Sequence, residues 1–175
     1  MKELMATFLI VFFCLMTQSC DQLYTFLDKR GAEEKDLIGD VNPFEKNSQV
    51  EEIQKLLKIY GYNPGTIDGI LGAQTRNSIE AFQKDNNLNL SRFMDQETWQ
   101  RLKIFEDNQF IVNQELNLRL VQKILKREGF NPGLIDGTWG AQTKTALMSF
   151  QKKNGLKPDG KIGYKTLTQL ATHLP

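Results

Sequence analysis

Two stretches of the chain carry apolar side chains at the spacing of one helix face. The positions are Ile53, Leu56, Leu57 and Tyr60 in the first stretch and Leu118, Val121, Ile124 and Leu125 in the second. This spacing predicts an amphipathic helix in each stretch. Each pattern stops at a glycine, Gly61 or Gly129, and glycine suits the left-handed residue that commonly ends a helix.

Two further helices are predicted in each stretch. A second helix follows Gly72 or Gly140, and its buried face consists of Thr75, Ser78, Ile79 and Phe82, or of Thr143, Ala146, Leu147 and Phe150. A third, shorter helix carries Trp99 and Leu102, or Leu167 and Leu170, and Asp95 suits its N-cap in the first stretch. Three short helices per stretch predict an all-α protein made of two tandem three-helix bundles.

The second stretch is a copy of the first at an offset of 68 residues. Residues 61–75 return nearly letter for letter as residues 129–143, and the alignment runs without a gap from Gln54 and Gln122 to Leu102 and Leu170. The shared unit is longer than the roughly 20 to 50 residues of most stacked solenoid repeats, so each copy is predicted to be a whole small domain. We place the domains at residues 50–112 (repeat 1) and 113–175 (repeat 2).

The N-terminus has the pattern of an export signal. A largely apolar run from Leu4 to Met16 is too short to span a bilayer as a helix, which takes about 20 residues, but it is typical of the central part of a secretory signal peptide. Ser19 and Cys20 resemble the lipobox of bacterial lipoproteins, which implies a signal peptide at 1–19 and lipidation of Cys20. An ordinary signal peptide or an uncleaved anchor stays open.

The segment 20–49 has mixed charge and no sustained apolar period, which predicts a linker between a membrane anchor and the repeats. If Cys20 is lipidated, the acyl chains hold the protein at a membrane. We therefore predict an exported protein of the periplasm or cell envelope.

Charge is unevenly divided along the chain. The net charge is +1, but residues 113–175 contain ten Lys or Arg against four Asp or Glu, which gives +6. Residues 50–112 contain seven against nine, which gives −2. A solvated surface and an attraction to an anionic polymer both explain this excess. Nucleic acid is not predicted as a partner, because the chain has an export signal and no base-reading motif.

A glycine-rich motif occurs in both copies. The pattern Asn-Pro-Gly-x-Ile-Asp-Gly-x-x-Gly-x-x-Thr lies at 63–75 and 131–143, and Phe-Gln follows at 82–83 and 150–151. Repeat 2 has a further turn with Gly155, Asp159-Gly160 and Gly163 before Thr166. These motifs resemble the peptidoglycan-binding domain family of bacterial cell-wall proteins, over about residues 50–171. The resemblance implies a groove that accepts the stem peptide or the glycan of peptidoglycan.

Repeat 1 departs from this pattern in the further turn. It has Asn87, Ser91-Arg92 and Asp95 where repeat 2 has Gly155, Asp159-Gly160 and Gly163. The loss of these glycines makes ligand binding by repeat 1 the more doubtful of the two.

The candidate ligand contacts are side chains around the motif that we expect to be exposed. They are Tyr62, Asn63, Gln74 and Arg76 in repeat 1, and Phe130, Asn131, Gln142 and Lys144 in repeat 2. Arg76 or Lys144 could pair with stem-peptide carboxylates, and the amides suit a peptide backbone. Asp68, Asp136 and Trp139 are also candidates, although fixing the turn for the aspartates and packing on the bundle for Trp139 are the alternatives. No cofactor or metal is predicted.

Catalysis is not predicted. His173 is the only histidine, which leaves no His-Glu-x-x-His metal site and no Cys–His pair. Asp68 and Asp136 belong to separate bundles, so nothing places them across one glycosidic bond at the ~5 to 9.5 Å that hydrolysis needs. The predicted function is therefore non-catalytic binding of peptidoglycan that tethers a membrane to the wall. The alternative is an interaction protein whose bundles bind and localise a cell-wall enzyme.

Overall fold

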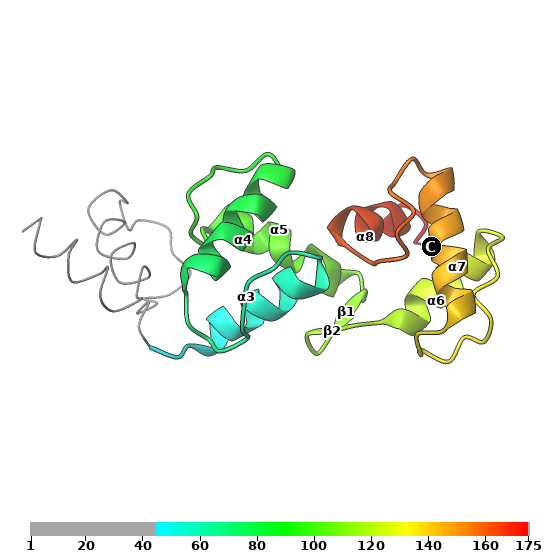
Figure 1. The fold of residues 1–175 in the computed structure, drawn as a ribbon, viewed down its shortest axis with the longest axis horizontal. Coiled ribbons are helices and arrows are strands. Elements are labelled where there is room, and N and C mark those ends of the chain that lie inside the picture. The colour runs from blue at the N-terminus through cyan, green and yellow to red at the C-terminus, as the bar shows by residue number, and fades with distance from the viewer. Residues whose placement is uncertain (1–44, 175) are drawn as a thin grey trace, which may run out of the picture. The chain divides into compact units, whose positions relative to one another are not determined.

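The structure, a computed structural model, describes residues 45–174. The predicted signal peptide, Cys20 and most of the predicted linker lie outside these residues. The helices are α3 (Ser48–Ile59), α4 (Ala73–Asp85), α5 (Gln96–Asp107), α6 (Leu118–Arg127), α7 (Ala141–Lys153) and α8 (Tyr164–Ala171) (Figure 1). The prediction of an all-α protein with three helices in each of two tandem repeats is confirmed. None of the helices from residue 45 onward is long and apolar enough to cross a membrane.

The helices bury the faces that the apolar spacing predicts and end where the glycines predict. Leu56 and Leu57 of α3 and Leu125 of α6 are buried. Gly61 and Gly129 have φ of 91° and 86°. The next N–H in each repeat reaches back into the helix, from Tyr62 to Leu57 O over 2.9 Å. This is the hydrogen bond of a glycine-terminated helix.

Asp95 is the N-cap of α5, as predicted. Its Oδ1 accepts a hydrogen bond of 2.7 Å from the Thr98 N–H. The corresponding residue in repeat 2 is Gly163, whose position before α8 has no side-chain cap. Repeat 1 has thus replaced a glycine with a residue that stabilises the same helix start.

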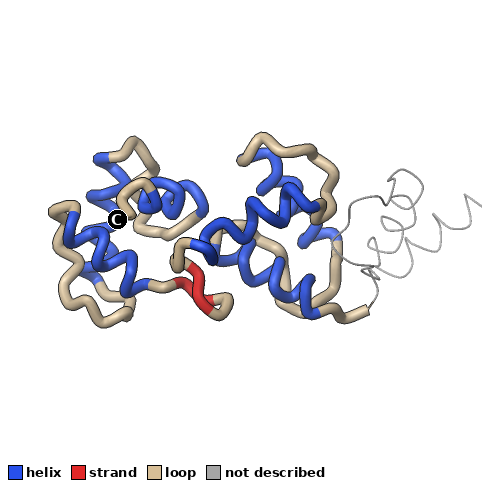
Figure 2. The backbone as a smooth tube through the Cα atoms, turned by 180° about the vertical axis from the view of Figure 1, so that it is seen from behind, coloured by secondary structure: helices blue, strands red, loops and turns tan. Residues whose placement is uncertain are grey.

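A small hairpin between α5 and α6 was not predicted. Strands β1 (Ile111–Val112) and β2 (Glu115–Leu116) pair antiparallel (Figure 2). The two residues of the turn, Asn113 and Gln114, have φ of 53° and 61°, which are the left-handed values of a tight hairpin turn. The hairpin begins four residues after α5, which continues to Asp107.

Backbone contacts divide the chain into two compact units. Among the described residues, unit 1 holds those up to Gln54 together with Pro64–Thr98, and unit 2 holds Lys55–Asn63 together with those from Trp99 onward. Aromatic packing within unit 2 explains why the end of α3 belongs to it. The Tyr60 ring makes edge contacts with Phe105 and Tyr164, and its hydroxyl donates to Leu102 O over 2.6 Å. The domain boundary at residues 112 and 113 stays a prediction.

Replacing Asn87 by glycine should stabilise the protein. Asn87 ends α4 with φ of 55°, and Gly155 takes the same position after α7 with φ of 69°. Glycine adopts this conformation without the steric cost of a side chain, so we expect a gain of about 0.5 kcal/mol in the free energy of unfolding. Urea denaturation measures this gain. The control is Asn86→Gly, at φ of −108°, which should destabilise the protein instead.

Candidate functional site

The motif of repeat 2 forms a turn that one glutamine holds from inside. Gln122 of α6 is buried. Its amide nitrogen donates to Asp136 Oδ1 at 3.2 Å, to Thr138 O at 3.0 Å and to Thr143 Oγ1 at 3.2 Å. Its amide oxygen accepts from the Gly137 N–H at 2.8 Å. An amide offers donors and an acceptor on one side chain, so a single glutamine fixes the whole turn.

The same arrangement, which we call the glutamine clamp, occurs at four turns. In each turn, the side chain of a buried glutamine forms hydrogen bonds with a short acidic or hydroxyl side chain and with two backbone groups. It also bonds to a threonine that lies seven residues after the acidic or hydroxyl residue. The glutamines are Gln54, Gln83, Gln122 and Gln151, and their turns are 68–70, 91–93, 136–138 and 159–161. Each repeat therefore contains two turns of the same construction.

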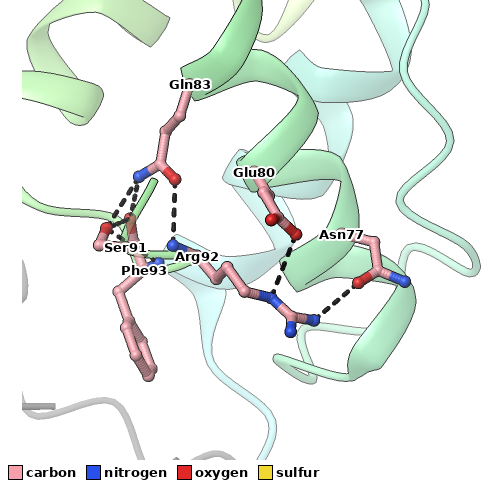
Figure 3. Close-up of polar contacts among 6 residues, drawn as sticks. All are labelled: Asn77, Glu80, Gln83, Ser91, Arg92 and Phe93. Atoms are coloured by element: carbon pink, nitrogen blue, oxygen red, sulfur yellow. Dashed lines mark hydrogen bonds and ion pairs between the residues drawn. The ribbon is translucent and has the colours of Figure 1, made fainter. Parts of the chain in front are cut away.

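The second turn of repeat 1 keeps this geometry without glycine. Gln83 donates to Ser91 Oγ and to Phe93 O, both at 2.9 Å, and accepts from the Arg92 N–H at 3.0 Å (Figure 3). Arg92 has φ of 64°, close to the 67° of its counterpart Gly160. The hydrogen bonds of the clamp thus hold a non-glycine residue in the same backbone conformation, and whether repeat 1 binds a ligand stays a prediction.

Hydrogen bonds within the turns lower the pKa values of the aspartates. The Thr138 N–H, the Thr138 hydroxyl and the Gln122 amide lower the pKa of Asp136 to about 2. Partial burial alone would raise the pKa of Asp68, but the hydrogen bonds from Gln54 and from the Ile70 N–H outweigh it, so that pKa is also lowered. Both carboxylates thus act as ionised acceptors within their turns.

The protein should lose stability in acid as these carboxylates are protonated. The folded-state pKa of Asp136 is about 2, against an ordinary value of 3.8. Its contribution is therefore fully present above about pH 4 and is lost as the pH falls from about 4 toward 2. Urea denaturation across this range should show the decline. In the Asp136→Asn variant, the loss of stability between about pH 4 and about pH 2 should be smaller. The control Asp107→Asn removes one exposed carboxylate from the end of α5 and should leave this loss unchanged.

The candidate residues of repeat 1 lie in different environments. Asn63 and Gln74 are exposed, whereas Tyr62 and Asp68 are partly buried. Arg76 has only 1% of its surface exposed, so the expectation that it is an exposed side chain is wrong. It faces inward among the buried residues of α4, which are Thr75, Ser78, Ile79, Phe82 and Gln83.

The candidate residues of repeat 2 are more open to solvent. Asn131, Asp136, Gln142 and Lys144 are exposed, and Phe130 is partly buried. Phe130 makes an edge contact with Phe150, and the Lys153 ammonium lies 5.5 Å from its ring. The Asn131 carboxamide accepts from the Gly133 N–H at 3.1 Å. Whether these residues contact a ligand stays a prediction.

Trp139 differs from the residues at the same position of the other three turns. That position is the third after the clamped side chain. Leu71 and Met94, at 6% and 4% exposure, are buried there, and Ile162 is partly buried. Trp139 is 48% exposed, so packing on the bundle, the alternative considered from the sequence, covers only about half of its surface. An exposed indole is a flat surface on which a ligand can stack.

The four clamp glutamines were not identified from the sequence as a set. Gln54 and Gln122 marked only the start of the alignment, and Gln83 and Gln151 belonged to the repeated Phe-Gln pair. The signal that could have identified them is that each glutamine precedes a turn whose first residue is followed, seven positions later, by a threonine. Between residues 45 and 174, no group of three or more His, Cys, Asp or Glu side chains could hold a metal ion.

These observations define a duplicated helical domain with two glutamine-clamped turns in each copy. The model of the family described as "Putative peptidoglycan binding domain" matches the chain twice, at residues 46–102 and 114–170. Because the two matches cover more than half of the chain, the chain belongs to this family. The resemblance stated from the motifs is thereby confirmed.

A curated relative matches the chain over part of its length. The chain is 31% identical over 112 residues to N-acetylmuramoyl-L-alanine amidase CwlM of Mycobacterium tuberculosis, and the match covers 58% of this chain and 27% of that protein. The chain thus spans about a quarter of the relative's length. No solved structure gives a significant match.

Proposed function

We propose that the protein binds peptidoglycan without catalysis, through its two tandem domains. The observation that carries this proposal is the double match to the peptidoglycan binding family, together with clamped turns in both copies. The similarity to part of a peptidoglycan amidase supports the same ligand. The family is one of binding domains, which supports a function without catalysis.

Binding would use the exposed side chains around the first turn of each repeat. In repeat 2, the amides of Asn131 and Gln142 suit a peptide backbone, and the exposed ring of Trp139 suits the apolar face of a sugar. We expect a single shallow site of this kind to bind at about 1 mM, which corresponds to about −4 kcal/mol. Two linked sites on a repetitive polymer gain affinity through effective concentration, without new contacts.

The proposal includes a membrane tether. In the exported protein, lipidated Cys20 would hold the chain at a membrane. The linker at 20–49 would then keep the two domains near the wall. Its support is the sequence pattern around Ser19 and Cys20. Mass spectrometry of the mature N-terminus tests this part separately, because an acylated cysteine differs in mass from an unmodified one.

The second candidate function is the alternative stated from the sequence. The two domains would then bind and localise a wall enzyme rather than the wall itself. Co-sedimentation with isolated sacculi at low salt separates the candidates. We expect the purified protein to pellet with sacculi, and Trp139→Ala to pellet less. If the unmodified protein stays in the supernatant, direct wall binding is wrong and the second candidate is favoured.

A further inference from the structure

Lysines that repeat 1 lacks lie in and beside the second turn of repeat 2. Lys144, Lys157 and Lys161 are all exposed. At the offset of 68 residues their counterparts are Arg76, Asn89 and Phe93, which are respectively buried, neutral and apolar. None of the three lysines forms an ion pair with another residue of the described chain. The excess positive charge of repeat 2 is therefore partly concentrated at one turn.

The three lysines lie close together around Gly160. Lys144 packs on this glycine so tightly that a Cβ there would lie 2.8 Å from Lys144 Cγ. Asp159 links the other two, because its N–H donates to Lys157 O and its Oδ1 accepts from the Lys161 N–H, both at 2.9 Å. Gln151 clamps the turn through Lys161 O at 2.9 Å and the Gly160 N–H at 2.9 Å. The lysines therefore extend from a fixed backbone.

The corresponding surface of repeat 1 is occupied by its own side chain. Arg92 stands at the position of Gly160, and its guanidinium extends along α4 (Figure 3). It pairs with Glu80 at 3.4 Å and donates to Asn77 Oδ1 at 2.7 Å. The Glu80 position in repeat 2 is Met148, so the acidic partner is absent there. Repeat 1 pairs its one cation at this turn with a carboxylate, whereas repeat 2 places three exposed lysines around the single carboxylate of Asp159.

We propose that Lys144, Lys157 and Lys161 form a binding surface for the carboxylates of peptidoglycan stem peptides. This inference rests on the proposed function and adds that repeat 2 supplies an electrostatic part of the affinity. An ammonium group pairs well with a carboxylate. Asp159 reduces the positive charge of the cluster but does not cancel it. Because the proposed ligand is peptidoglycan, the occupant is the stem peptide, and a phosphate polymer of the envelope is an outcome of the test.

The test compares two triple variants of equal charge. Lys144→Gln, Lys157→Gln and Lys161→Gln together should weaken binding to sacculi about tenfold, since each exposed ion pair contributes modestly. The control replaces Lys123, Lys126 and Lys152, which are exposed and are also lysines at the matching positions of repeat 1, Lys55, Lys58 and Lys84. The control should bind as the unmodified protein does. Circular dichroism confirms that both variants are folded.

Soluble fragments identify the ligand. A muropeptide with free stem carboxylates should compete with sacculi for the unmodified protein, and the same muropeptide with amidated carboxylates should compete several-fold less. Equal competition by the two fragments, or equal binding by the two triple variants, would overturn the lysine surface while leaving wall binding intact. Loss of binding after phosphate polymers are stripped from the sacculi would also overturn it. Failure of the unmodified protein to bind any sacculi contradicts the proposed function itself.

Discussion

Replacing Gln122 by alanine should lower the free energy of unfolding by about 3 kcal/mol, because it leaves several partly buried polar groups without partners at once. The Gly137 N–H and the Thr138 carbonyl both lose the side chain that pairs with them. The Asp136 carboxylate also loses one of its donors. Urea denaturation followed by circular dichroism measures the change.

Two other variants show whether the clamp causes this loss. Gln142→Ala removes the same side chain from an exposed position near the start of α7, and it should cost less than about 0.5 kcal/mol. Gln122→Glu keeps an acceptor for the Gly137 N–H but removes the donors and brings a second carboxylate to Asp136, so it should destabilise more at neutral pH than in mild acid. A loss below about 1 kcal/mol for Gln122→Ala would contradict the structural role of the clamp.

The elements that could be predicted from the sequence are those with local causes. The apolar spacing of α3 and α6 reports one helix face, and Gly61 and Gly129 end these helices through their own backbone freedom. The Asp95 cap depends on a residue three positions away. In each case the physical cause lies within a few residues, so a single sequence contains enough information to place the element.

The features that were missed depend on partners far apart in the chain. Gln122 and Thr143 are 21 residues apart, and no periodicity connects a helix glutamine to a turn in the following loop and a threonine in the next helix. Arg76 and Lys144 occupy the same position of the repeat, but only the structure shows that the first is buried and the second exposed. The turn at Asn113 and Gln114 lacks the Asn-Gly pair that marks many such hairpins.

The two repeats keep their supporting residues and differ at the surface. All four clamps retain the glutamine and the threonine, whereas the exposed side chains next to them change. Leu71 of repeat 1 is buried, whereas Trp139 at the same position of repeat 2 is exposed. At the second turn, repeat 1 has Arg92 paired with Glu80, whereas repeat 2 has three exposed lysines. A conserved support with a changed surface is what we expect if repeat 2 carries more of the ligand affinity and repeat 1 adds to it by avidity.

Replacing Gly69 by alanine should lower the free energy of unfolding by about 3 kcal/mol. Gly137→Ala, the counterpart in repeat 2, should lower it by about 1 kcal/mol. The two glycines have similar φ of 76° and 79°, so alanine is strained equally at both. Their surroundings differ. A Cβ at Gly69 would lie 2.8 Å from Asn47 O, whereas at Gly137 the nearest atom is Arg119 Cβ at 3.6 Å, an ordinary contact.

The extra cost in repeat 1 arises because Asn47 cannot move freely. Its side-chain oxygen accepts from the Gln49 N–H at 2.7 Å at the start of α3, and its own N–H donates to Gly69 O at 2.9 Å. A methyl group at Gly69 would have to displace this residue and weaken the first turn of α3. Urea denaturation of the two variants side by side measures the difference. Equal costs would mean that Asn47 yields without loss, and that only the backbone conformation of the glycines matters at these turns.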